Sequence, residues 1–526
     1  MTTRAFMILA VLAALSVALS GCGGSRSIGP SNSAPPLDRG SVRVTVQWPQ
    51  PGNRAIPDDA VRINITIVGT GVGEFTESID RPQTALTLDN VPVGSRTIKA
   101  SAFAQGNETP GALGEATVTV VKDETANAEI VLQLLTASEQ SVYAGLAKIR
   151  DIVFVSTAEP TSAEVQAVFD DSDAAVTADG NNSRAQAGYA VAKLWLESVK
   201  LIEKYPSIFP PEEELFSRSP DLLLQTAEPI RMLSFFKLAD SVKDQGNPVR
   251  AVIPQYADVY KLPAQSRTVV PVADVIAFQA DLKDIMLPAI DDALAHLALA
   301  EADPAFMMRH GYNWDPSVPY VIIDRGDLLI FDGLVRATKA LMLLGVSYNA
   351  DSGTFNWDLQ GSALDANSDG TLTPSEYMPA DPWGTLTEPA LMGQIKTVLD
   401  EACIKVQAGL GETLAEEGDF YDFLNWHTPG GNVTETELVS FKAAVFQLQQ
   451  ALTTPQAIPI PLENGDVVIV RIDISAWSND PPADLKDMFP NKSAVSDDVI
   501  PGTWPDPSFG GIFPDDLPDS VLNSMN

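Results

Sequence analysis

The sequence of 526 residues has few of the side chains that carry most enzyme chemistry. Its three histidines, His296, His310 and His427, are scattered, and its two cysteines, Cys22 and Cys403, form no Cys-x-x-Cys pair. It contains no Walker A loop, no H-E-x-x-H, no G-x-S-x-G and no complete dinucleotide fingerprint. Among 69 acidic residues the sequence singles out no catalytic carboxylate pair. We therefore expect a protein without catalysis.

Basic residues are also scarce, with 34 Lys and Arg against 69 Asp and Glu and a net charge of −35. Such a charge repels phosphate backbones, so we predict no nucleic-acid partner and favour cations or neutral ligands. No internal apolar run reaches the 18 or so residues that a membrane-spanning helix needs. A hydrophobic content of 45% indicates a folded protein all the same.

The N-terminus has the pattern of a secretory signal, with Arg4 followed by an apolar stretch over 5–19. The residues Leu19-Ser20-Gly21-Cys22 resemble the lipobox of bacterial lipoproteins. The resemblance implies a signal peptide over 1–21, lipid attachment to the sulfur of Cys22, and the membrane as a partner through that lipid. An ordinary signal peptide with a nearby cysteine is the alternative.

The residues after Cys22 extend the same interpretation. Gly23 follows Cys22 where lipoproteins retained at the inner membrane carry Asp, so the resemblance implies the outer membrane of the cell envelope. The segment 22–40 is rich in Gly, Ser and Pro, which is typical of a flexible tether.

From 41 to 135 the hydrophobic period is two, and short strands alternate with Gly, Pro, Asn and Asp. The clearest alternation is that of Val42, Val44, Val46 and Trp48, and then of Val61, Ile63, Ile65 and Ile67. Six or seven such strands predict an all-β sandwich. The passage 90–103 resembles carboxypeptidase regulatory-like or transthyretin-like modules, which implies a spacer or adhesion unit.

Over 136–455 the period becomes 3.6 and predicts a mainly α-helical domain. Capping-box patterns at 161–164 and 183–186 begin two helices, 161–178 and 183–205. The second helix resembles a tetratricopeptide helix through Ala185, Gly188, Tyr189, Ala192 and Leu196, although an ordinary helix hairpin gives the same pattern. Further helices are predicted at 272–300 with an interruption at Pro288, and at 327–346, 391–410 and 435–452.

The last segment, 456–526, is predicted to be a hairpin followed by an irregular tail. The hairpin covers 458–472 and turns at Asn464-Gly465. Apolar side chains in the tail indicate that it packs on the helical domain; they are Trp504, Phe509, Ile512 and Phe513. The sequence thus predicts a multidomain protein with a β-sandwich, a helical domain and an irregular tail.

One motif carries specific chemistry, the twelve residues 365–376. They match the EF-hand loop, in which oxygen ligands wrap around Ca²⁺ and a glycine allows the sharp turn, here Gly370. The predicted calcium ligands are Asp365, Asn367, Asp369, Thr371 through its carbonyl, Thr373 through a water, and Glu376. Gly361 precedes the loop closely and Pro379 follows it, so full flanking helices are not expected. A lone loop of this kind favours a structural calcium clip over a sensor.

Tryptophans in loops leave a second interpretation open. Trp314, Trp357, Trp383 and Trp426 could stack on sugar rings if exposed, or anchor irregular chain if buried, and we favour anchoring. The leading hypothesis is a lipid-anchored, calcium-binding envelope protein that acts as a binding or scaffold module toward a protein or glycan partner. The alternative is a carbohydrate-binding outer-membrane lipoprotein or a cryptic glycan hydrolase.

Overall fold

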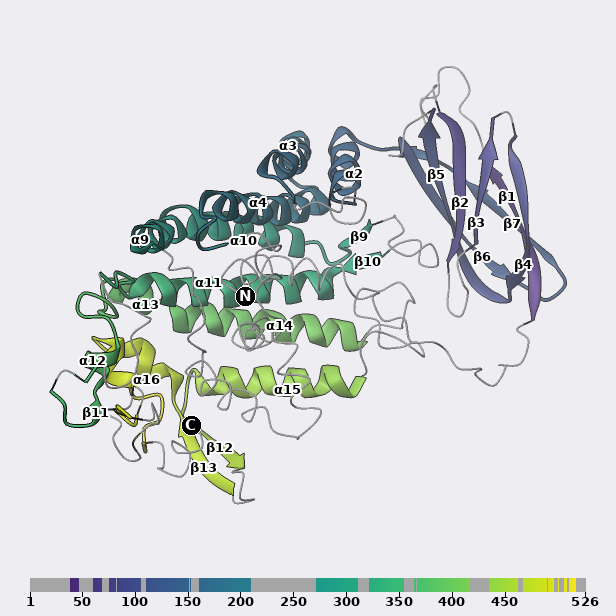
Figure 1. The fold of residues 1–526 in the computed structure, drawn as a ribbon. Helices are drawn as coiled ribbons and strands as arrows, with labels where there is room; N and C mark the ends of the chain where they lie inside the picture. The colour runs from purple at the N-terminus through teal and green to yellow at the C-terminus, as the bar shows by residue number, and fades with distance from the viewer. Residues whose placement is uncertain are drawn as a thin grey trace.

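An N-terminal β-rich region is followed by a helical region, in the predicted order (Figure 1). The computed structural model describes residues 38–46, 60–68, 75–81, 83–105, 110–150, 152, 160–209, 271–310, 321–353, 364–365, 367–415, 435–461, 467–489, 491–495, 500, 506–508 and 510–516. The predicted signal peptide, Cys22 and most of the predicted tether lie outside these residues. Within them, no helix is both long enough and apolar enough to cross a bilayer.

The β-region consists of two sheets that share one core. In one sheet β1 pairs antiparallel with β4 and parallel with β7, and in the other the antiparallel order is β3-β2-β5-β6-β8. Valines of β1 and isoleucines of β2 belong to the same buried cluster, which shows that the two sheets pack face to face. The strands are β1 (Arg39–Val46), β2 (Ala60–Val68), β3 (Phe75–Asp80), β4 (Ala85–Pro92), β5 (Gly94–Ala104), β6 (Ala112–Val120), β7 (Thr125–Ile130) and β8 (Gln133–Leu134).

The alternation predicted for 61–67 is correct for Ile63, Ile65 and Ile67 and wrong for Val61. The pairing register between β2 and β5 shifts between Ala60 and Arg62. This bulge puts Ala60 in the core and leaves Val61 37% exposed. Sequence periodicity does not register an inserted residue, so the outermost position was assigned to the wrong face.

Two further strand predictions need correction. The alternation did not single out β3. The pattern of residues 128–134 predicts one further strand, but these residues contribute to two strands in different sheets. The chain leaves the first sheet after Ile130 and joins the second at Gln133. The strands end at Leu134 and helix α2 begins at Ala137.

The helical region is built from long helices that pack one against the next. Along the chain α3 packs on α2, α4 on α3, α10 on α4, α11 on α10, α14 on α11 and α15 on α14. Figure 1 shows α4, α11, α14 and α15 lying one below another. The long helices are α2 (Ala137–Arg150), α3 (Ser162–Ala178), α4 (Ser183–Lys204), α9 (Val272–Asp281), α10 (Leu287–Glu301), α11 (Arg325–Ser347), α14 (Ile395–Ala415) and α15 (Glu435–Ala451).

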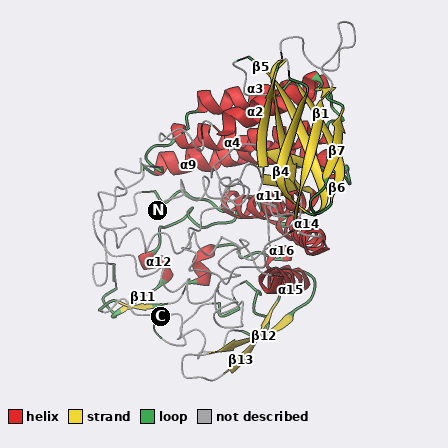
Figure 2. Ribbon diagram, turned by 90° about the vertical axis from the view of Figure 1, so that its right-hand side faces the viewer, coloured by secondary structure: helices red, strands yellow, loops and turns green. Residues whose placement is uncertain are grey.

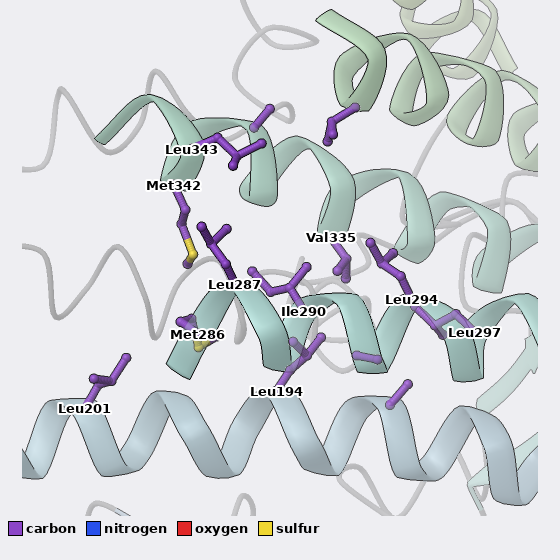
Figure 3. Close-up of a cluster of buried hydrophobic side chains, with 14 of the residues drawn as sticks. Leu194, Leu201, Met286, Leu287, Ile290, Leu294, Leu297, Val335, Met342 and Leu343 are labelled. Carbon is purple, nitrogen blue, oxygen red and sulfur yellow. The ribbon is translucent and has the colours of Figure 1, made fainter. Parts of the chain in front are cut away.

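Leucine, isoleucine and methionine side chains fill the space between α4, α10 and α11. Figure 3 shows Leu194 of α4 beside Ile290 of α10, whereas Leu294 of α10 extends the other way, toward Val335 of α11. The chain positions of these residues follow the 3.6-residue period that predicted the helices. Burial of this stripe is what holds α10 between its two neighbours.

Of the two predicted capping boxes, one is correct and one is wrong. Thr161 and Glu164 form the expected capping box at the start of α3. The second predicted box is wrong, because Asn182 caps α4 by accepting hydrogen bonds from the backbone of Arg184 and Ala185. Gln186 instead donates to the carbonyl of Gly180.

The predicted interruption at Pro288 is a π-helical turn between α9 and α10, η3 (Leu282–Met286). Pro288 has no N–H to donate to the carbonyl four residues earlier. The helix accommodates the missing hydrogen bond with one wider, π-helical turn. In this turn the N–H of Leu287 donates to the carbonyl of Leu282, five residues earlier.

Short elements connect and end the helical region. Figure 2 shows β11, β12 and β13 lying away from the β-region. The short elements are β9 (Met307–His310), β10 (Val321–Asp324), β11 (Thr371–Leu372), α12 (Pro374–Tyr377), α13 (Pro389–Met392), β12 (Gln456–Pro461), β13 (Val467–Ile472), α16 (Ile474–Asn479), η5 (Leu485–Met488) and β14 (Lys492–Ser493).

The C-terminal segments have the predicted hairpin and a tail that returns to it. β12 and β13 pair antiparallel around 462–466, which includes the predicted Asn464-Gly465 turn but lies outside the described residues. In the tail the backbone N–H of Asp473 donates to the carbonyl of Ile512 at 2.7 Å, and Ile512 and Phe513 are half-buried. Trp504 and Phe509 lie outside the described residues.

Helices α11 and α14 approach closely at glycines. A Cβ added to Gly333 would lie 2.4 Å from Cγ2 of Val406 and 2.8 Å from the carbonyl oxygen of Ala402. A Cβ added to Gly409 would lie 2.5 Å from the carbonyl oxygen of Gly326. These distances are shorter than non-bonded contacts allow, so the crossing requires residues without a side chain.

Gly333→Ala is therefore expected to destabilise the helical region by about 1 to 3 kcal/mol through overpacking. Gly345 provides a matched control on the same helix, because a Cβ there meets nothing within 4 Å. Gly345→Ala should stabilise by up to about 1 kcal/mol, since Gly is a poor helix former. Urea unfolding of both variants measures the two effects, and equal changes of the same sign would contradict the close crossing.

Candidate functional site

The predicted calcium loop has its side-chain oxygens turned toward its own backbone. Asp365 accepts hydrogen bonds from the N–H of Asp369 at 3.2 Å and from that of Gly370 at 2.9 Å. Asn367 also accepts from the N–H of Asp369, and Asp369 accepts from that of Thr371 at 2.8 Å. Three side chains at alternate positions thus wind the chain into a tight loop.

The turn itself requires left-handed backbone. Gly370 has φ +84°, although nothing lies within 4 Å of where its Cβ would be. The conformation, and not lack of space, is therefore the reason for a glycine here. Ser368 also has a positive φ, of +58°.

After the turn the loop is fixed by a distant strand. Thr371 and Leu372 form β11, which pairs antiparallel with Lys492 and Ser493 of β14. The N–H of Ala494 donates to the carbonyl of Gly370 at 3.0 Å, and Leu372 is fully buried. No second EF-hand loop was found in the sequence, and β14 takes the place that a paired loop's strand would occupy.

The end of the loop is also the start of a short helix. Oε2 of Glu376 accepts hydrogen bonds from the N–H and from the hydroxyl of Thr373, both at 2.8 Å. Helix α12 is four residues long and ends just before Pro379, as the sequence predicted. Gly361 and Ala366 lie outside the described residues.

The donor chemistry of the loop fits a calcium ion, because every predicted ligand offers a hard oxygen. Within the described part of the chain, no three His, Cys, Asp or Glu side chains converge as a ready-made metal site. Glu376 is engaged with Thr373 and not with the oxygens of Asp365 and Asp369. Gathering the three carboxylates would therefore require a cation to offset their repulsion.

Of the four tryptophans considered for sugar stacking, the structure describes only Trp383. It is half-buried in the turn 381–384, where its backbone N–H donates to the carbonyl of Ala380. Trp314, Trp357 and Trp426 lie outside the described residues.

His296 has a packing position between helices α10 and α4. Its ring lies 4.0 Å from that of Tyr189, between centroids, and its Nδ1 is hydrogen-bonded to Oε1 of Gln186. Burial lowers the pKa of His296, so the neutral ring is favoured. The hydroxyl of Tyr189 donates to Asp292 at 3.1 Å, and burial first, then Asp292, raises the pKa of Tyr189 to about 12.

Sequence patterns did not predict the charged cluster that lies inside the helical region. Asp332 of α11 is completely buried and Glu301 of α10 nearly so, and Lys405 of α14 contacts both. An aspartate inside the apolar run Leu-Leu-Ile-Phe-Asp over 328–332 was the one available signal. The three side chains come from three different helices, and Lys405 lies more than 70 residues after both carboxylates, so no spacing rule connects them.

No protein-family model, curated protein or solved structure matches this chain.

Cys403 lies on α14 among buried apolar side chains, and its exposure is 3%. Burial first, and then the Asp400 carboxylate, raise the pKa of the Cys403 thiol to about 12. At pH 8 only about one thiol in 10⁴ would be a thiolate, the reactive form.

We therefore expect Cys403 to resist alkylation in the folded protein. In Cys22→Ser, where Cys403 is the one remaining cysteine, a maleimide or iodoacetamide at pH 8 should react roughly 1000-fold more slowly than in urea. Mass spectrometry of the modified chain measures both rates. Similar rates in the two conditions would show that Cys403 is accessible.

Proposed function

We propose that this chain is a lipid-anchored protein of the cell envelope that binds calcium at 365–376 and acts as a binding or scaffold module without catalysis. The observation that best supports this proposal is the conformation of the loop 365–376. Asp365, Asn367 and Asp369 lie at alternate positions and bend the chain around their own oxygens. The turn at Gly370 has the backbone conformation that the motif needs.

Calcium would be held by the side chains of Asp365, Asn367 and Asp369, the carbonyl of Thr371, a water near Thr373, and Glu376. The ion would supply positive charge where three carboxylates meet. Because β11 is paired to β14, the ion would stabilise the contact between the loop and a segment more than 110 residues later. A role as a structural clip follows from this connection.

The order of the long helices supports a scaffold. Successive helices from α2 to α15 pack side by side, an arrangement typical of helical repeat proteins that present extended surfaces to partners. The hairpin of α3 and α4 is the part proposed to be tetratricopeptide-like. The β-region, with two sheets around a common core, is proposed to be a carboxypeptidase regulatory-like spacer between this helical region and the lipid at Cys22.

Calcium is expected to raise the stability of the folded chain by mass action. With a dissociation constant of roughly 10⁻⁴ to 10⁻³ M, 5 mM calcium would contribute about 1 to 2.3 kcal/mol. Glu376→Gln should remove the calcium-specific part, because it removes one of the three loop carboxylates. Isothermal calorimetry and melting curves, with magnesium at equal ionic strength as reference, measure this effect.

Glu77→Gln is the matched control, since it makes the same change at an exposed position of β3. It should keep the wild-type calorimetric titration. If wild type and Glu376→Gln respond identically to calcium, the loop is an acidic turn and not a calcium site.

The anchor is tested separately through Cys22. Wild type expressed in a bacterium with a lipoprotein pathway should partition into the detergent phase, and Cys22→Ser should remain in the aqueous phase, because the acyl chains supply the membrane affinity. Metabolic labelling with a fatty acid gives an independent measurement. Equal partitioning of the two forms would contradict lipidation at Cys22.

A further inference from the structure

A network of charged side chains is enclosed where α10, α11 and α14 meet. Glu301 is the last residue of α10 and is 6% exposed, and Asp332 of α11 is 0% exposed. The ammonium group of Lys405 contacts Oε2 of Glu301 and lies 3.3 Å from Oδ2 of Asp332. Arg336 contacts Oδ1 of Asp332 and also Glu401.

The four carboxylate oxygens of Glu301 and Asp332 differ in whether they have a hydrogen-bond or ion-pair partner. Both oxygens of Asp332 and Oε2 of Glu301 face a cationic donor. Oε1 of Glu301 is buried and has no hydrogen-bond partner. An ionised carboxylate accepts hydrogen bonds on both oxygens. Burying one of these oxygens without a donor carries a large desolvation penalty.

A proton on Oε1 of Glu301 removes this penalty. It neutralises the carboxyl group and makes Oε1 a donor toward Asp332, which can accept it. Burial first, and then the nearby Asp332 carboxylate, raise the pKa of Glu301 to about 7. Glu301 also ends a helix, where the backbone dipole disfavours a negative charge.

We propose that Glu301 and Asp332 form a proton-binding site, and that the bound proton is part of the packing of α10 against α11 and α14. A proton fits because Lys405 and Arg336 already occupy the directions from which a metal ion would approach the other oxygens. The site makes the stability of the helical region depend on pH near neutrality.

Among the described residues, the charged groups of the network around Glu301 belong to α11 and α14. From α11 they are Asp332 and Arg336, with Arg325 donating from its Nε to the Glu301 carbonyl. From α14, Lys405 contacts Glu301 itself, while Glu401 pairs with Arg336 and Glu412 pairs with Arg325. Asp324 and Asp327, at the start of α11, are engaged in its capping box.

Helix α4 packs on α10 from the other side. The groups of α10 that meet it are Asp292 and His296, which bond Tyr189 and Gln186 of α4. At about 100° per residue, Asp292 lies roughly half a turn around α10 from Glu301. These groups therefore lie away from the proposed site.

The sign of the effect follows from the raised pKa. The folded chain keeps the Glu301 proton up to about pH 7, whereas the unfolded chain releases it near the ordinary value of 4.5. The contribution to stability is therefore fully present below pH 4.5 and is lost as the pH rises through 7. Over this range the unfolding equilibrium constant should rise by about two orders of magnitude from this one group.

Glu301→Gln tests the proposal, because glutamine imitates the protonated acid at all pH values. Urea unfolding of the full chain between pH 4.5 and 8 should show a decline for wild type that exceeds the decline for Glu301→Gln. The difference between the two curves cancels the contributions of the other titrating groups. Parallel curves would overturn the proposal.

Two further measurements keep the test decisive. Glu401→Gln, at the exposed edge of the same network, should retain the wild-type pH dependence. Infrared difference spectra of the folded wild type between pH 5 and 8 should show one protonated carboxyl band that disappears with a midpoint near neutral pH and is absent from Glu301→Gln. If the band is missing from the wild type, a water or a cation occupies the place of the proton and the proposal fails.

Discussion

The close contact between α11 and α14 determines much of the helical region. It requires glycine at 333 and 409, because any side chain there would collide with the opposite backbone and with a buried valine or isoleucine. The contact leaves no space for water between the two helices, so the polar side chains beside it must find partners within the protein. Asp332 directly precedes Gly333, and it finds them in Lys405 and Arg336.

The same contact explains why charges are tolerated inside this part of the protein. A buried ion pair is retained only when its geometry satisfies most of the hydrogen-bonding capacity of both groups. Asp332 meets this condition with cations on both of its oxygens, whereas Glu301 meets it with one oxygen. The carboxylate that lacks a partner on one oxygen, Glu301, lies at the end of α10. This helix packs between α4 and α11.

The sequence predicted what depends on local pattern. Periodicity located Ile63, Ile65 and Ile67 of β2 in the core and predicted a helical region after the strands, and the capping box at Thr161 set the start of α3. It failed where the outcome depends on geometry or on distant residues. A bulge moved Val61 to the surface, and Asn182 displaced Ser183 as the cap of α4 because Gln186 bonds Gly180 and His296. The EF-hand motif predicted the turn at Gly370, but nothing in it indicated β14 as the partner of β11.

The loop 365–376 and the Glu301–Asp332 pair face opposite physical problems, so the two proposals made for them involve different ions. In the loop 365–376, solvent screens the carboxylates, and backbone N–H groups occupy their oxygens, so repulsion appears only when a shared ligand draws them together. At Glu301 and Asp332 the helices already force the carboxylates together, and cations are built into the neighbouring positions. The loop would therefore need a positive charge only to gather its carboxylates around one point, whereas the buried pair lacks one hydrogen-bond donor. A divalent ion would meet the first need and a proton the second, so the two proposals place the effects of calcium and of pH in separate parts of the molecule.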